Sequence, residues 1–131
     1  MFQATGRIRY SEHKEDAKWW MVVDCDPEIG KYYRSLFAIT HYHCKTLFRP
    51  AWEAHISVIR GEKPPNDKCH LWRKYDGQLV KYYYDSQARG DDVYVWLDVE
   101  CDFLLDIREE MGLPRHPMYS LHLTIGNLKH I

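Results

Sequence analysis

The chain has 131 residues, of which 45% are hydrophobic and 15% aromatic, and its formal net charge is −1. This length and hydrophobic content predict a single compact domain over residues 1–131. The near-neutral charge excludes the broad basic surface that holds proteins on duplex DNA through many phosphate contacts, and it is compatible with a short or compact nucleotide ligand.

Targeting signals and disulfides are not expected. No apolar run approaches the roughly 20 residues of a membrane-spanning helix, and residues 1–10 lack the regions of a signal peptide. We therefore expect a cytoplasmic protein that does not associate with membranes. The cysteines are scattered without C-x-x-C spacing, so reduced thiols are expected at Cys25, Cys44, Cys69 and Cys101.

The sequence pattern of the N-terminal half predicts two strands, a helix and a third strand. Residues 2–10 form a short strand, and the apolar run 19–23 forms the next. Asp26 is suited to cap a helix that starts at Pro27, because its side chain can accept a backbone hydrogen bond there. After this helix comes the strand 54–59. The apolar stripe predicted for the helix consists of Ile29, Tyr32, Tyr33 and Leu36.

The C-terminal half repeats this order. The strand 93–97 leads into a helix that ends near Gly112, and the strand 120–125 follows. Between the halves, the Asp76-Gly77 turn predicts a hairpin of residues 71–75 and 78–84, followed by an exposed polar connection. The predicted fold class is α+β, with two pseudo-symmetric strand-helix-strand lobes that face each other across a central cleft.

Each half ends in a strand that carries a His-apolar-Ser/Thr motif. Because side chains alternate along a strand, His55 and Ser57 share one face of the first strand, and His122 and Thr124 share one face of the second. Two imidazoles on either side of one phosphate can act as general base and general acid, while the hydroxyls hold the phosphate oxygens. These four residues are the predicted catalytic residues, and the chemistry needs no metal and no other cofactor.

The paired motifs resemble the signature of the two-histidine (2H) phosphoesterase superfamily, which includes LigT-like and cyclic phosphodiesterase enzymes. This resemblance extends over most of the chain. Residues 50–62, 74–77 and 120–126 are most similar to the bacteriophage anti-CBASS nucleases. The resemblance implies metal-independent cleavage of 3′,5′ bonds in cyclic di- and trinucleotide messengers, by which a phage evades antiviral signalling in the host cytoplasm.

Five further residues are candidates for substrate binding. Tyr10 and Trp72 stand among charged residues and are candidates for stacking on bases, although both rings are equally compatible with the edge of the core. Arg60 and Lys74 are candidates for neutralising phosphate, and Glu62 for accepting a hydrogen bond from a base amino group. The alternative for these three is a solvated surface charge. The oligomeric state, the base preference and the assignment of acid and base stay open.

A zinc site is one alternative. His41, His43 and Cys44, together with the pair Cys69-His70, supply ligands of the zinc type, although their spacing does not follow a usual zinc knuckle.

Two other functions also compete. A short RNA-like substrate with a terminal 2′,3′-cyclic phosphate is one alternative, as in RNA repair or processing. A module that sequesters nucleotides without turnover is the other, but it has no need of a matched acid and base.

Overall fold

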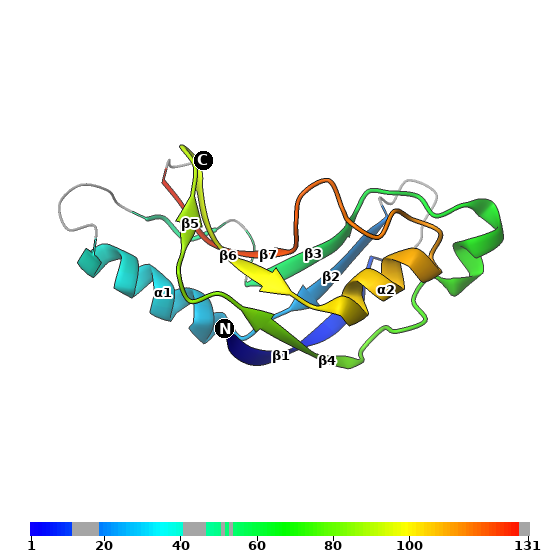
Figure 1. Cartoon of the computed structure of the whole chain (residues 1–131), viewed down its shortest axis with the longest axis horizontal. Helices are drawn as coiled ribbons and strands as arrows, with labels where there is room; N and C mark the ends of the chain where they lie inside the picture. Colours follow the sequence, from blue (N-terminus) through cyan, green and yellow to red (C-terminus); the bar gives the residue numbers. More distant parts are fainter. Residues whose placement is uncertain (12–18, 41–46, 51, 53, 129–131) are drawn as a thin grey trace.

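The computed structural model describes residues 1–11, 19–40, 47–50, 52 and 54–128. Within these residues, the chain forms seven strands, two α-helices and one 3-10 helix (Figure 1). The strands are β1 (Phe2–Tyr10), β2 (Trp20–Asp24), β3 (His55–Arg60), β4 (Leu79–Tyr84), β5 (Arg89–Gly90), β6 (Tyr94–Glu100) and β7 (His122–Asn127). The helices are α1 (Pro27–Thr40), the 3-10 helix η1 (Asn66–Leu71) and α2 (Asp102–Glu110).

All seven strands belong to one antiparallel sheet in the order β4-β1-β2-β3-β7-β6-β5. An additional antiparallel pairing of β4 with β6 closes the sheet on itself. The structure is therefore mixed α and β, with many strands and few helices, which agrees with the predicted class at this coarse level.

Each of the two α-helices packs against a strand from the other half of the chain. They lie at opposite ends of the molecule in Figure 1. Helix α1 follows β2 but packs against β7, and α2 follows β6 but packs against β3. Each helix thus contacts the motif strand of the other half of the chain.

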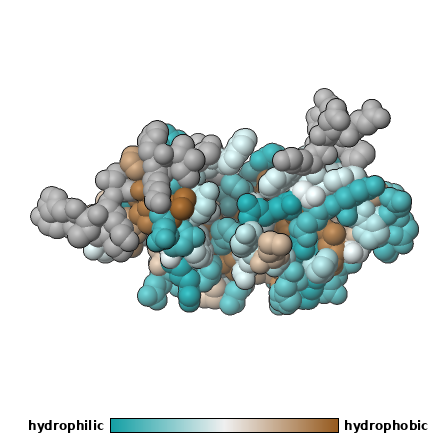
Figure 2. Space-filling view, turned by 90° about the horizontal axis from the view of Figure 1, so that it is seen from above, coloured by the Kyte–Doolittle hydropathy of each residue, from teal (hydrophilic) through white to brown (hydrophobic). Residues whose placement is uncertain are grey.

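The core is built by the alternation that the sequence predicts for the motif strands. Ile56 and Val58 of β3 and Leu123 and Ile125 of β7 are fully buried. Apolar side chains of α2 join the same core. Figure 2 views the molecule from above and shows a largely hydrophilic surface with small hydrophobic patches, as expected when most apolar side chains are inside.

Helix α1 begins as predicted but turns a different face to the sheet. The backbone N–H of Glu28 donates to the Asp26 carboxylate at 3.0 Å, which is the predicted N-cap. The predicted apolar stripe is wrong at two positions, because Tyr32 and Leu36 are exposed. Burial follows the neighbouring stripe of the helix instead, which consists of Gly30, Tyr33 and Phe37.

The predicted hairpin is also corrected. Residues 71–75 do not form a strand, because η1 ends at Leu71 and turns follow it. Strand β4 pairs instead with β1, which is far away in sequence. The turn itself is present, since Gly77 has a φ of +82°, which glycine adopts without strain. The connection after β4 is exposed, but it contains the short strand β5, which pairs with β6.

Two further sequence expectations concern membranes and thiols. Neither α-helix described here has the length and apolar character to cross a bilayer. In the described part of the chain, Cys25, Cys69 and Cys101 are free thiols. Cys44 lies outside the described residues.

Candidate active site

The two motif strands are direct neighbours. Strands β3 and β7 pair antiparallel, with Ile56 in register with Leu123. In an antiparallel ladder, this register puts His55 across from Thr124 and Ser57 across from His122. All four side chains are half-buried, whereas the residues that alternate with them are fully buried.

This register places the two imidazoles diagonally across the strand pair. Diagonal neighbours in an antiparallel pair have Cα or Cβ atoms about 7–8 Å apart, so long side chains on them can reach a common group. The two hydroxyls occupy the other diagonal. A tetrahedral phosphate between the four side chains can therefore meet an imidazole on each of two sides and a hydroxyl on each of the others.

The four side chains line one open cleft of about 1160 Å³. This volume slightly exceeds the range typical of small-molecule sites and is sufficient for a ligand of two or three nucleotides. The lining also contains three arginines, Arg49, Arg60 and Arg89, and two carboxylates, Asp91 and Asp98. Its aromatic residues are Phe48, Trp52, Tyr94, Trp96 and Tyr119.

The ring of His122 is oriented by the backbone. Its Nδ1 lies 2.7 Å from the carbonyl oxygen of Ser120. Because a carbonyl oxygen only accepts hydrogen bonds, Nδ1 carries a proton and Nε2 is the nitrogen that can take up or deliver a proton. The Trp96 ring lies beside this imidazole, with 6.2 Å between the ring centroids and an angle of 62° between the ring planes.

Each motif histidine has an aspartate across from it on its outer neighbouring strand. Asp24 of β2 is in register with His55, and Asp98 of β6 is in register with His122. Sequence reasoning missed these two aspartates as neighbours of the site. Their matching positions in the sequence could have revealed them. Asp24 lies at the end of the strand before α1, and Asp98 lies near the end of the strand before α2.

The surroundings of the two aspartates match as well. Arg9 donates two hydrogen bonds to Asp24, at 2.8 and 3.1 Å, and Arg89 binds Asp98 at 2.7 Å. Both β2 and β6 have a register shift at the equivalent place, two residues before the aspartate. Of these two aspartates, Asp98 lines the cleft and Asp24 does not.

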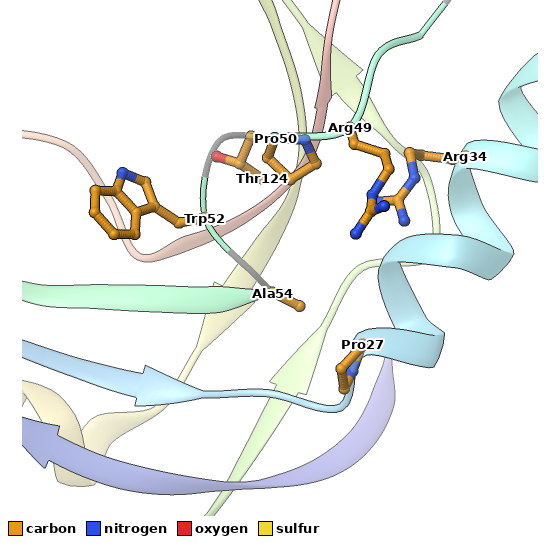
Figure 3. Close-up of a pocket in the computed structure, with 7 residues that line it drawn as sticks. All are labelled: Pro27, Arg34, Arg49, Pro50, Trp52, Ala54 and Thr124. Atoms are coloured by element: carbon orange, nitrogen blue, oxygen red, sulfur yellow. The ribbon is translucent and has the colours of Figure 1, made fainter.

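A smaller pocket of about 20 Å³ adjoins the cleft at Thr124. Figure 3 shows the guanidinium groups of Arg34 and Arg49 lying close together on one side of this pocket. Arg34 also donates to the carbonyl oxygen of Ile125 at 2.9 Å. Both arginines thus line the same small pocket as Thr124.

Of the predicted substrate-binding residues, Arg60 lies in the cleft. Its side chain lines the cleft, and its guanidinium carbon is 5.6 Å from the centroid of the Tyr119 ring. This distance is within the range of a cation–π contact.

The expectation that Tyr10 and Trp72 stack on bases is not met by this structure. The Tyr10 side chain is only 4% exposed, and burial raises the pKa of its phenol. The Trp72 ring packs edge-on against Tyr10 and Trp19, at 4.9 Å in each case, and its indole N–H donates to the Ser11 carbonyl. Neither ring lines the cleft, because both fill the junction between β1 and the segment after η1.

Glu62 and Lys74 are engaged in ion pairs outside the cleft. Both carboxylate oxygens of Glu62 accept from Arg108 at 2.8 Å, and this hydrogen bonding lowers the pKa of Glu62. Lys74 pairs with Glu110, which raises the pKa of the lysine. Neither residue lines the cleft, and their roles toward a base and a phosphate stay predictions.

No cluster of three or more histidine, cysteine, aspartate or glutamate side chains suited to a metal occurs in the part of the chain that the structure describes. Of the alternative zinc ligands, His41, His43 and Cys44 lie outside the described residues.

Comparison with known protein families, curated proteins and solved structures gave no match for this chain.

Proposed function

We propose that the chain is a metal-independent two-histidine phosphodiesterase that cleaves 3′,5′-phosphodiester bonds of cyclic di- and trinucleotides. The observation that carries this proposal is the register of Ile56 with Leu123, which brings both His-x-Ser/Thr motifs onto one face of neighbouring strands. Both motifs line the same cleft. Purely structural roles of two strand histidines do not require that they share one face of the sheet and one open cleft.

We further propose that the fold consists of two pseudo-symmetric strand-helix-strand lobes around this cleft. The crosswise packing of α1 on β7 and of α2 on β3 supports this view, as do the matched register shifts of β2 and β6. The pseudo-twofold axis would then pass between Ile56 and Leu123, at the centre of the four motif side chains.

The proposed reaction is an internal attack by the ribose 2′-hydroxyl on the adjacent phosphorus. A neutral motif histidine removes the proton of that hydroxyl, and the protonated motif histidine delivers a proton to the departing 5′ oxygen. Ser57 and Thr124 donate hydrogen bonds to the non-bridging oxygens. The new bond joins the 2′ oxygen to phosphorus as the bond to the 5′ oxygen breaks, which yields a 2′,3′-cyclic phosphate and a free 5′-hydroxyl.

The substrate supplies its own nucleophile in this scheme. A 2′-hydroxyl next to a 3′,5′ linkage is already held near phosphorus, and such intramolecular attack has a large proximity advantage. In the biological setting that the sequence resemblance implies, the reaction removes the cyclic messengers of an antiviral response and protects a phage.

A substrate panel tests the proposal. Cyclic dinucleotides, cyclic trinucleotides, 2′,5′-oligoadenylate and RNA with a 2′,3′-cyclic phosphate end are incubated with the protein in EDTA, and the products are identified by mass spectrometry. Cleavage of the cyclic oligonucleotides by the wild type, with loss of that activity in His55→Ala, supports the proposal. Opening of the terminal cyclic phosphate alone would instead identify an RNA-end phosphodiesterase. Recovery of all ligands intact would leave a nucleotide-sequestering module.

A further inference from the structure

Aromatic rings approach the four motif side chains from two different directions. Trp96 is on β6, one strand away from β7, and is in register with Thr124. Tyr119 lies before β7 in the chain, beyond the end of the strand that carries His122. Both rings line the same cleft as the motifs.

The Trp96 ring is held in place by a chain of polar contacts. Its indole N–H donates to the Asp98 carboxylate at 3.2 Å, and Arg89 binds the other oxygen of Asp98 at 2.7 Å. The planes of the Trp96 and His122 rings are inclined at 62°, with 6.2 Å between the ring centroids, so the two rings are not stacked on each other. A rigid, partly exposed indole beside a proton-transfer group is suited to stack on a planar ligand.

Tyr119 is more exposed and is accompanied by a cation. Tyr119 is 62% exposed, so its ring is accessible to a ligand in the cleft. The Arg60 guanidinium lies over its ring, with 5.6 Å from the guanidinium carbon to the centroid. An aromatic ring with an arginine beside it is the combination with which proteins stack bases while neutralising the adjoining phosphate.

The two rings flank different ends of the motif His122-Leu123-Thr124. Trp96 is in register with Thr124 and so lies diagonally across from His122, whereas Tyr119 precedes His122 by three residues, before the strand begins. Adjacent bases in a nucleic-acid helix are about 3.4 Å apart along one strand. A ligand that uses both rings must therefore hold its two bases apart.

We propose that Trp96 and Tyr119 each stack one of the two bases joined by the scissile phosphate. This inference rests on the proposed function and deepens it. The substrate class is then a phosphodiester between two nucleosides whose bases are splayed apart. A single nucleoside with a terminal 2′,3′-cyclic phosphate would occupy one of the two rings and leave the other uncovered.

Binding measurements test this without requiring turnover. The probe is the adenine dinucleotide ApA with a 2′-O-methyl group at the linkage, which cannot undergo internal attack, and the reference is 2′-O-methyladenosine 3′-phosphate, which has one base. By calorimetry, the wild type is expected to bind the dinucleotide at least about 5-fold more tightly, because stacking of one additional base typically contributes that much or more.

Substitutions at Trp96 and Tyr119 distinguish loss of a base site from general unfolding, because unfolding would weaken the binding of both ligands in both variants. Trp96→Ala and Tyr119→Ala are each expected to weaken dinucleotide binding by about 5-fold or more, whereas only one of them weakens binding of the mononucleotide. Trp96→Phe and Tyr119→Phe keep a ring and should retain most of the affinity. Tyr83→Ala is the matched control, because Tyr83 is exposed on β4 and does not line the cleft.

Wild-type affinity of either alanine variant for the dinucleotide would overturn the proposal, as would equal wild-type affinity for the two ligands. Turnover of a cyclic dinucleotide is scored separately. If the binding pattern holds while the cyclic dinucleotide stays intact, the two base sites are supported and the proposed cleavage is wrong. If the cyclic dinucleotide is cut while both alanine variants bind normally, the proposed cleavage is supported and the base sites are wrong.

Discussion

Replacement of Glu62 by alanine is expected to destabilise the protein without touching its chemistry. The partner of Glu62 is Arg108, whose side chain is 1% exposed and whose guanidinium also donates to the carbonyl oxygens of Val58 and Pro114 at 2.8 and 2.9 Å. Removing the carboxylate leaves a buried positive charge with two carbonyl partners and no counter-charge. Loss of one member of a buried pair typically costs about 3–5 kcal/mol. The Glu62 side chain is 34% exposed, so water can partly replace it, and we expect about 2–4 kcal/mol.

Urea unfolding of Glu62→Ala and of the wild type measures this difference. The matched control is Glu28→Ala, because the Glu28 and Lys31 side chains are 72% and 62% exposed and their pair lies on the surface of α1. That substitution is expected to change the free energy of unfolding by less than about 0.5 kcal/mol.

The same pair predicts a pH dependence. Arg108 lowers the pKa of Glu62 from its ordinary value of 4.5, so the unfolded chain binds this proton more readily than the folded protein does. The stabilisation is therefore fully present above the unfolded pKa and is lost as the pH falls through the folded pKa. The stability difference between wild type and Glu62→Ala should shrink correspondingly in acid. Unchanged unfolding of Glu62→Ala together with lost ligand affinity would refute this reasoning and return Glu62 to the binding site.

Four further predictions concern the reaction. His55→Ala and His122→Ala should each lower turnover of cyclic dinucleotides by at least about 100-fold with an unchanged circular dichroism spectrum, because a general acid or base contributes that much; near wild-type turnover would remove that histidine from the mechanism. Ser57→Ala and Thr124→Val should each cost less, since each removes one neutral hydrogen bond to phosphate. Activity should persist in EDTA and follow a bell-shaped pH profile, whereas abolition by chelator and recovery with zinc or magnesium would contradict the proposed chemistry. Replacing the attacking 2′-hydroxyl by hydrogen should block cleavage but not binding, and cleavage of the deoxy analogue at a comparable rate would point to an activated water instead.

Local patterns of the sequence predicted the elements that position the candidate site. The alternation of His55, Ile56 and Ser57 gave the correct face for each side chain, because burial of every second residue is a property of the strand itself. The N-cap at Asp26 was predicted for the same reason, since it depends on residues within one helical turn.

Long-range pairing could not be predicted in this way. The pairing of β4 with both β1 and β6 joins segments that share no local pattern, so the hairpin signal at Asp76-Gly77 was interpreted too simply. The partner of Glu62 lies 46 residues away on α2, and no local rule connects them.

The misplacement of Tyr10 was avoidable. Arg7 and Arg9 are exposed on β1, and Ile8 and Tyr10 alternate with them toward the core. The two-residue period of this strand therefore carried the information that Tyr10 faces inward. Its charged neighbours in sequence suggested exposure, whereas its neighbours in space are Trp72 and the core.

The crosswise packing of the two helices has a mechanical consequence. Helix α1, which follows β2, covers β7, and α2, which follows β6, covers β3. The N-terminal half alone would contain β3 without α2, and the C-terminal half alone would contain β7 without α1. Neither half by itself would therefore hold its motif strand against the helix that covers it in the whole chain. Any motion that widened the gap between β3 and β7 would have to slide both helices at once. The span between the two imidazoles is thus fixed by the fold, and a ligand must adopt a shape that fits that span.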